Sequence, residues 1–251
     1  SSYAKKFGAV DRTKLTGQSV LSFDIMQYEM DMQLKGLQFH DNLMPINQFW
    51  SMHLTFPVLG SGAGNQPFKT VKNYDDFLGR IHDFTSYVDT MISNMKRGVA
   101  MGIVPPRSLM EKVLPQLTNI IVKDPMKSVF AGPIKKFPEG FSEEDKKRLT
   151  DLYTTAIATE IVPSYEKLYS YIKDEYIPKC RTTSGISEIP GGKEMYSYLA
   201  KFWTTTNLTP DEIYAIGEKE VARIRGEMER IKIETGFKGT LKEFFHFIHT
   251  D

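Results

Sequence analysis

Apolar residues recur along much of the chain with the period of an α-helix. The clearest stripe, at alternating steps of four and three residues, is Phe77, Ile81, Phe84, Val88, Met91 and Met95. This spacing places all of these side chains on one face of a helix. Asn73 stands where a capping residue is needed, and Gly98 stands where the helix can end. We therefore expect a long amphipathic helix between Asn73 and Gly98.

The same periodicity and a set of capping residues predict helices elsewhere. A second stripe near the N-terminus consists of Leu21, Ile25, Tyr28 and Met32. Thr209 and Glu212 form a capping box around Pro210, which predicts a helix that ends at Gly236. Thr240 and Glu243 repeat the box and predict a final helix.

Ser142 precedes an acidic first turn and predicts the start of another long helix. Its pattern continues past Pro163 to about Tyr176. A proline inside a helix removes a hydrogen bond and clashes with the preceding turn, so we expect a kink or a break there. The later stripe is Tyr165, Tyr169, Ile172 and Tyr176, and this spacing is typical of core packing.

Strand signals are weak, because no Asn-Gly or Asp-Gly turn joins two alternating runs. Two glycine-rich loops, 60–65 and 184–192, lie between helical segments. No segment has the composition of a linker between domains. We therefore predict an all-α fold, a multi-helix array with long kinked helices, in which residues 1–251 form a single helical unit.

The composition of the chain excludes several classes of protein. Of 251 residues, 41% are hydrophobic and 12% are aromatic, which excludes a disordered tail. The net charge of +1 excludes a nucleic-acid binder held by bulk positive charge. A single cysteine, Cys180, excludes a disulfide framework and a cysteine-rich zinc site. The longest stretch without Asp, Glu, Lys or Arg, Asn42–Phe68, is too polar to form a membrane span.

Few residues form a recognisable chemical motif. His246 and His249 stand one helical turn apart, with Asp251 close behind, and are a candidate metal-binding set. The competing interpretation is an aromatic amphipathic helix with histidines at its edges. Cys180, although next to Arg181, has no histidine partner in sequence and is interpreted as a structural thiol. The glycines of 60–64 are interpreted as a surface loop rather than a phosphate cradle.

The loop 184–192 is the stronger functional candidate. It ends in Pro190-Gly191-Gly192 and opens a helix whose first turns carry Tyr196 and Tyr198. Unpaired N–H groups at a helix N-terminus suit a carboxylate or an anionic transition state. The alternative, a simple connector, explains the loop equally well.

Several segments together resemble the DUF885 family of bacterial proteins. They are Met95–Arg107 with its Gly98, Gly102 and Pro105-Pro106-Arg107; Ile161–Leu168; Asp174–Arg181; Pro190–Tyr196; Leu208–Val221; and Gly236–Phe244. Their order and spacing match from about Leu21 onward, over most of the chain. The resemblance implies that the parent protein is a helical zinc metallopeptidase, similar in architecture to the thermostable carboxypeptidases. It also implies that this chain corresponds to the N-terminal half of that fold. Family members are about twice this length, and many are secreted or lipoproteins, which implies a periplasmic or cell-envelope location.

The family's metal motif, a His-Glu followed by Pro-Gly-His and a further Glu, lies beyond the region matched. The resemblance therefore implies zinc in the parent protein with ligands outside these residues, and no catalytic residue is carried over. Gly192 and Tyr196 match the family's motif, and we expect them to face a peptide substrate, with the tyrosine hydroxyl supporting an oxyanion. The start at Ser1 lacks a signal sequence and is typical of an interior position in a longer chain.

Three interpretations of the sequence remain. The first is the cleft-forming N-terminal part of a peptidase, inactive alone, with an exposed apolar face that pairs with the missing C-terminal half or with itself. The second is a non-catalytic helical binding or interaction module. The third is an enzyme in its own right that uses His246, His249 and Asp251.

Overall fold

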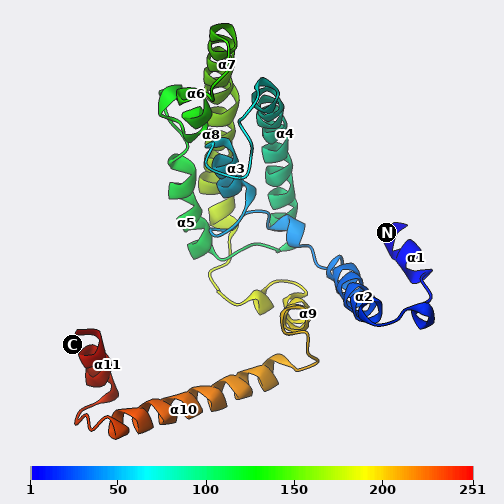
Figure 1. Ribbon diagram of the computed structural model, residues 1–251, viewed down its shortest axis with the longest axis vertical. Coiled ribbons are helices and arrows are strands. Elements are labelled where there is room, and N and C mark those ends of the chain that lie inside the picture. The colour runs from blue at the N-terminus through cyan, green and yellow to red at the C-terminus, as the bar shows by residue number, and fades with distance from the viewer. Residues whose placement is uncertain (1, 251) are drawn as a thin grey trace. The chain divides into compact units, whose positions relative to one another are not determined.

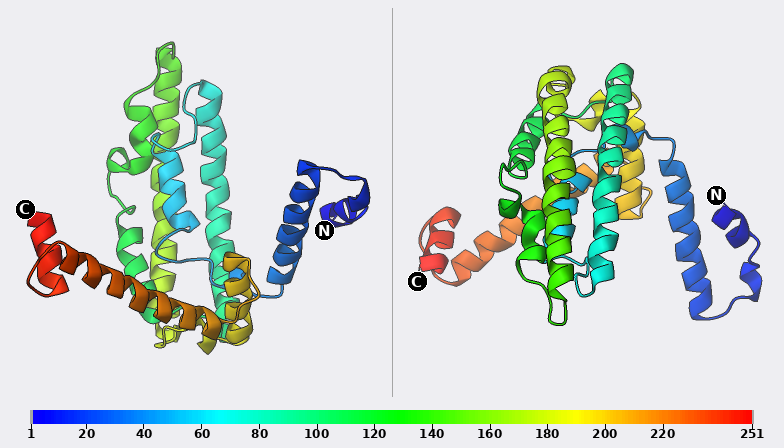
Figure 2. Two further views of the ribbon diagram at one scale, coloured as in Figure 1. Left: turned by 60° about the horizontal axis from the view of Figure 1, so that its bottom comes forward. Right: turned by 90° about the horizontal axis from the view of Figure 1, so that it is seen from above.

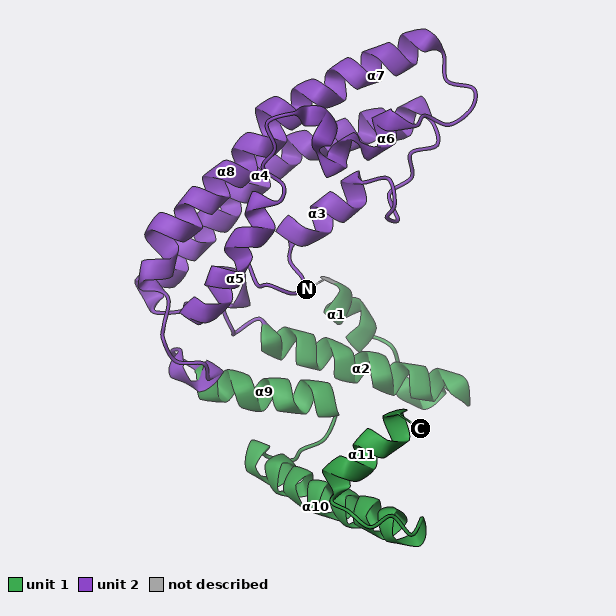
Figure 3. Ribbon diagram, turned by 90° about the vertical axis from the view of Figure 1, so that its left-hand side faces the viewer, with its two compact units in different colours: residues 1–36, 192–251 green, residues 37–191 purple. Residues whose placement is uncertain are grey.

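A computed structural model describes residues 2–250 of the chain (Figure 1). The regular elements in this range are helical, apart from an isolated parallel bridge between Pro106 and Arg181, so the all-α prediction is confirmed. None of the helices in the described range combines the length and the apolarity of a membrane span. The chain divides into two compact units, residues 37–191 and residues 1–36 with 192–251 (Figure 3). The expectation of one helical unit stays a prediction.

The unit of residues 37–191 is a bundle around an aromatic core. Its helices are α3 (Met52–Gly60), α4 (Val71–Met101), α5 (Arg107–Thr118), α6 (Gly132–Lys135), α7 (Glu143–Ala156) and α8 (Val162–Ser170). Helix α4 packs along α7 and α8, and α5 packs on α8 (Figures 1 and 2). The stripe predicted on α4 is buried from Phe77 to Met95. Burial of so many large apolar side chains is the main stabilising term of this unit.

Helix α4 differs from the prediction at both ends. It begins at Val71, because Thr70 is the cap and Asn73 is its partner in a capping box. It ends at Met101 and not at Gly98, and Gly102, whose φ of 69° is left-handed, is its C-cap. Gly98 lies inside the helix, where a Cβ would come within 2.7 Å of the carbonyl oxygen of Ile103. Gly98 is therefore required for close backbone packing rather than for termination.

The long helix predicted from Ser142 is present, and its interruption has a defined form. The Ser142 hydroxyl accepts a 3.0 Å hydrogen bond from the Asp145 N–H and starts α7. A π-helical segment, 157–161, leads into α8, where Pro163 occupies the first turn. A wider turn at this point accommodates the missing N–H donor of the proline. A second π-helical segment, 171–176, follows α8.

The second unit contains α1 (Ser2–Gly8), α2 (Gln18–Gly36), α9 (Gly192–Thr204), α10 (Pro210–Glu234) and α11 (Leu241–Thr250). Two tyrosines join α2 to α9: the Tyr28 hydroxyl donates to the Lys201 carbonyl at 3.1 Å, and the Tyr198 hydroxyl donates to the Met32 carbonyl at 2.8 Å. The predicted capping boxes at Thr209 and Thr240 are both formed.

Helix α10 carries an apolar stripe that this unit leaves uncovered. Its members are Ile213, Val221, Ile224, Met228 and Ile231. None of the residues of α10, all of them in the described range, is buried, and Val221 is 67% exposed. Helix α11 lies beside it, and the two form a groove of about 510 Å³ flanked by Arg225 and Lys242. An amphipathic helix without a buried face normally has a further packing partner.

Candidate functional site

Segments that are far apart in sequence and carry the family-like motifs meet in the unit of residues 37–191. The Arg107 N–H donates a 2.8 Å hydrogen bond to the carbonyl of Arg181, next to the bridge between Pro106 and Arg181. In return, the Arg181 Nε donates to the carbonyl of Val104 at 3.1 Å. The motifs 95–107 and 174–181 are therefore two sides of one structural junction.

The guanidinium of Arg181 also fixes the start of the loop 184–192. Its Nη1 donates to the carbonyl oxygens of Thr183, at 2.6 Å, and Gly185, at 2.7 Å. Burial lowers the pKa of Arg181, and Glu188 acts in the opposite direction. At the far end of the loop, the Pro190 ring packs against Gly102, where a Cβ would lie 3.7 Å from Pro190 Cγ. The loop is thus anchored to the junction near both of its ends.

Cys180 lies inside this junction and is 5% exposed. Burial raises the pKa of its thiol to about 11, although Arg107 and Arg181 act in the opposite direction. At neutral pH the group is therefore a thiol and a poor nucleophile, in agreement with its interpretation as structural. Two other buried polar atoms here, Arg107 Nε and the Tyr176 hydroxyl, have no hydrogen-bond partner among the described residues.

The two residues expected to face a substrate lie on α9. Gly192 is buried at the helix N-terminus and follows Gly191, whose φ is +70°. Tyr196 lies one turn further along and is 52% exposed. Tyr198, which is also on this helix, is engaged with α2 and is not a free site residue. The first turn of α9 has main-chain N–H groups without an intrahelical partner, as any helix start does. That Gly192 and Tyr196 contact a substrate stays a prediction.

The candidate metal residues are described only in part. His246 and His249 lie on α11 and are exposed, and Asp251 lies outside the described residues. Between residues 2 and 250 no three His, Cys, Asp or Glu side chains converge as metal ligands would. A catalytic zinc site has three protein ligands, and the interpretation that His246, His249 and Asp251 bind a metal stays a hypothesis.

A polar network surrounds His53, which stands in the sequence as an isolated histidine. The His53 ring is 1% exposed, with Nδ1 3.0 Å from the Ser51 hydroxyl and Nε2 3.1 Å from Gln116 Oε1. The Gln116 amide nitrogen donates to the Gln48 carbonyl at 2.9 Å, so its oxygen faces the ring and Nε2 carries the proton. Burial lowers the pKa of His53, and the bond to Gln116 acts in the opposite direction. No sequence pattern pointed to this network, because Gln116 lies 63 residues from His53.

Comparisons with known proteins identify a family and a similar solved structure. The model of the family described as "Bacterial protein of unknown function (DUF885)" matches residues 1–251. A search of curated proteins found no match. Among solved structures, the chain is similar to "the putative lipoprotein from Colwellia psychrerythraea", with a TM-score of 0.75 and 22% sequence identity. The similarity covers 83% of this chain and 36% of the Colwellia chain, so at this identity it shows a shared fold over part of a longer protein.

Proposed function

This chain belongs to the DUF885 family, and from that premise we propose that its 251 residues form the N-terminal, cleft-forming part of a zinc peptidase with a carboxypeptidase-like fold. The zinc ligands and the general base would come from outside these residues. By the same reasoning the parent protein would be a lipoprotein of the cell envelope, and the description of the Colwellia protein as a "putative lipoprotein" supports this.

One observation supports this proposal above the others. The junction of Arg107 and Arg181 anchors the loop 184–192, and that loop leads directly into a helix start with an exposed tyrosine one turn away. The N–H groups at the start of α9 and a hydroxyl one turn further along the same helix suit the binding of a peptide carbonyl as it becomes an oxyanion. Tyr196, which is 52% exposed, would supply the hydroxyl.

The first test is the coding sequence. We expect it to continue beyond codon 251 and to encode a His-Glu followed closely by Pro-Gly-His. A stop codon directly after Asp251 would overturn the proposal. The second test is zinc-dependent hydrolysis of peptides by the complete gene product. There we expect Tyr196→Phe to lower kcat by about 10²-fold, the cost of removing one oxyanion donor. The exposed Tyr214 offers a matched control, Tyr214→Phe, which should leave kcat unchanged.

A non-catalytic interaction module is the second candidate, and the uncovered stripe of α10 favours it. A helix that presents Val221 and Ile224 to solvent is suited to binding another helix. This function predicts no zinc-dependent hydrolysis by the complete gene product and a stable complex with a partner chain. The two candidates therefore differ in the outcome of the hydrolysis assay.

A further inference from the structure

The groove between α10 and α11 has an apolar floor that both helices supply (Figure 1). Its apolar lining residues are Val221, Ile224 and Met228 from α10 and Leu241 and Phe245 from α11. On α10 these residues are three and four positions apart, and on α11 they are four apart, so each set lies on one face of its helix. The groove therefore resembles a helix packing from which one helix is missing.

The shape of this apolar surface favours a helix as the occupant over a small ligand. The stripe on α10 runs from Ile213 to Ile231 and spans about 27 Å of helix at 1.5 Å per residue. A groove between two helices offers only side chains, so its occupant has to satisfy its own main-chain hydrogen bonds, as a helix does. Amphipathic helices bind in such grooves through apolar residues at positions i, i+3, i+4 and i+7.

The charged residues that line the groove are both positive. They are Arg225 on α10 and Lys242 on α11, one from each helix. Neither forms an ion pair with another residue in the range 2–250. Arg223, two positions before Arg225, is in contrast paired with Glu220 at 2.8 Å. An occupant with carboxylates on both flanks of its apolar face therefore complements the groove in charge.

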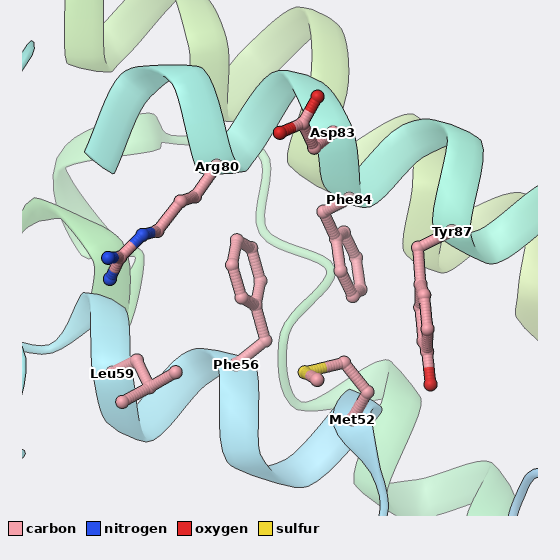
Figure 4. Close-up of a pocket in the computed structure, with 7 residues that line it drawn as sticks. All are labelled: Met52, Phe56, Leu59, Arg80, Asp83, Phe84 and Tyr87. Atoms are coloured by element: carbon pink, nitrogen blue, oxygen red, sulfur yellow. The ribbon is translucent and has the colours of Figure 1, made fainter. Parts of the chain in front are cut away.

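The groove between α3 and α4, of about 380 Å³, has no such pattern (Figure 4). Its lining includes the stacked rings of Phe56 and Phe84, whose centroids are 4.3 Å apart. Arg80 donates a hydrogen bond to Gln66, and the carboxylate of Asp83 points away from the groove. The charged groups of the α3–α4 groove therefore specify no occupant.

The proposed function indicates where the complementary helix comes from. The similarity to the Colwellia protein covers 36% of that chain, so most of that protein lies outside the matched region. If residues 1–251 are the N-terminal part of a longer protein, a helix from the remaining part is tethered to the groove. Tethering gives such a helix a high effective concentration, so it competes well against free partners.

We propose that the α10–α11 groove binds an amphipathic helix with Asp or Glu on both flanks of its apolar face, and that this helix belongs to the parent protein outside residues 1–251. The choice of source rests on the proposed function, whereas the helical form and the acidic flanks follow from the groove itself. The apolar face of this helix would pack on Ile224 and Met228. One of its carboxylates would pair with Arg225 and another with Lys242.

Peptide binding to the 251-residue chain tests the chemistry of the groove. The chain is titrated into a fluorescent helical peptide that has leucine along one face and glutamate on both flanks, and into the same peptide with lysine in place of each glutamate. Fluorescence anisotropy, at protein concentrations too low for self-association, measures both affinities. We expect the glutamate peptide to bind about tenfold more tightly, the combined effect of two exposed ion pairs. Equal affinities, or tighter binding of the lysine peptide, would overturn the proposal.

Three variants locate the binding. Arg225→Glu combined with Lys242→Glu should reverse the preference, so that the lysine peptide binds more tightly. Lys112→Glu combined with Lys219→Glu makes the same change in net charge at exposed lysines that do not line the groove, and it should leave the preference unchanged. Ile224→Asp should weaken the binding of both peptides by about tenfold, the scale of a lost apolar contact. Reversal by both double variants, with equal circular dichroism, would show that net charge and not the groove determines the preference, and would overturn the proposal.

The complete gene product tests the source of the helix. We expect it to bind neither peptide, because the parent protein's own helix fills the groove. If it hydrolyses peptides with zinc but still binds the glutamate peptide as tightly as the 251-residue chain does, this inference fails and the proposed function stands.

Other occupants give different results. A coding sequence that stops after codon 251 would overturn the proposed function and the source of the helix together, and a preference for the glutamate peptide would then assign the groove to a separate acidic chain. Self-association that Arg225→Glu with Lys242→Glu weakens as much as it weakens binding of the glutamate peptide would assign the groove to a second copy and overturn the proposal.

Discussion

The hydroxyl of Tyr165 donates a 2.8 Å hydrogen bond to the main-chain carbonyl of His53, 112 residues away in sequence. Both residues are buried, so this bond joins α8 to α3 inside the core of the 37–191 unit. It also fixes the backbone at the residue whose ring anchors the Ser51 and Gln116 network. The loop before α3, which carries Phe49 and Trp50, is therefore connected to the core through His53.

Removal of the Tyr165 hydroxyl should lower stability. Tyr165→Phe keeps the ring and leaves the buried carbonyl of His53 without this donor, which costs about 1–3 kcal/mol. Tyr169→Phe is the matched control, because Tyr169 is half-buried on the same helix and its ring lies near Lys173. Urea denaturation should show a lower free energy of unfolding for Tyr165→Phe alone. Equal values for the two variants would contradict an energetic role for this bond.

Acidification should destabilise the fold through His53. Burial lowers its pKa from the ordinary value of 6.5, so below that pH the unfolded chain takes up a proton that the folded chain does not. Stability should be independent of this group above about pH 7, and it should fall as the pH drops through 6.5 toward the lowered pKa. Urea denaturation between pH 5 and pH 8 (roughly the range in which histidine titrates) measures the effect.

The variant His53→Gln should remove this contribution. Its free energy of unfolding should therefore change less between pH 5 and pH 7, which lies within the range of about 5 to 8 in which histidine ordinarily titrates. His82→Gln is the control, since the side chain of His82 is 80% exposed and contacts Glu160. A profile for His53→Gln as steep as that of the unsubstituted chain would show that other groups dominate the acid sensitivity.

The helices that begin after Ser142 and Thr209 were predictable from sequence because they depend on local spacing and capping. Helices α3 and α5 were not predicted. The roles of Gly98 and His53 were not, because both depend on partners far away in sequence. Gly98 has the sequence context of a terminator, and only the fold brings Leu43 and Ile103 against it. The junction of Arg107 with Arg181 was visible only as separate family-like motifs. The start of α4 was also misplaced, because Thr70 and Asn73 are both residue types that can cap a helix and the sequence alone does not show which of them does.

Two glycines of α4 should respond in opposite directions to the same substitution. In Gly98→Ala the new Cβ meets the carbonyl oxygens of Ile103, at 2.7 Å, and Leu43, at 2.8 Å, so we expect a loss of about 1–3 kcal/mol. In Gly79→Ala nothing lies within 4 Å, and the higher helix propensity of alanine should add about 0.5–1 kcal/mol. Thermal unfolding of both variants measures the difference. Stabilisation by Gly98→Ala would contradict the close packing of Gly98 against the carbonyl oxygens of Ile103 and Leu43.

The uncovered stripe of α10 should make the isolated 251-residue chain self-associate. Val221 is 67% exposed in the middle of that stripe, and burial of a side chain of its size in a helix contact contributes about 1.5 kcal/mol or more. Val221→Lys should therefore raise the protein concentration at half-association by about tenfold or more. Ala222→Lys adds the same charge on the neighbouring, exposed residue outside the stripe and is the control. Sedimentation velocity over a range of concentrations distinguishes the two. A chain that stays monomeric at high concentration, or association that Ala222→Lys weakens equally, would show that the stripe is not an association surface.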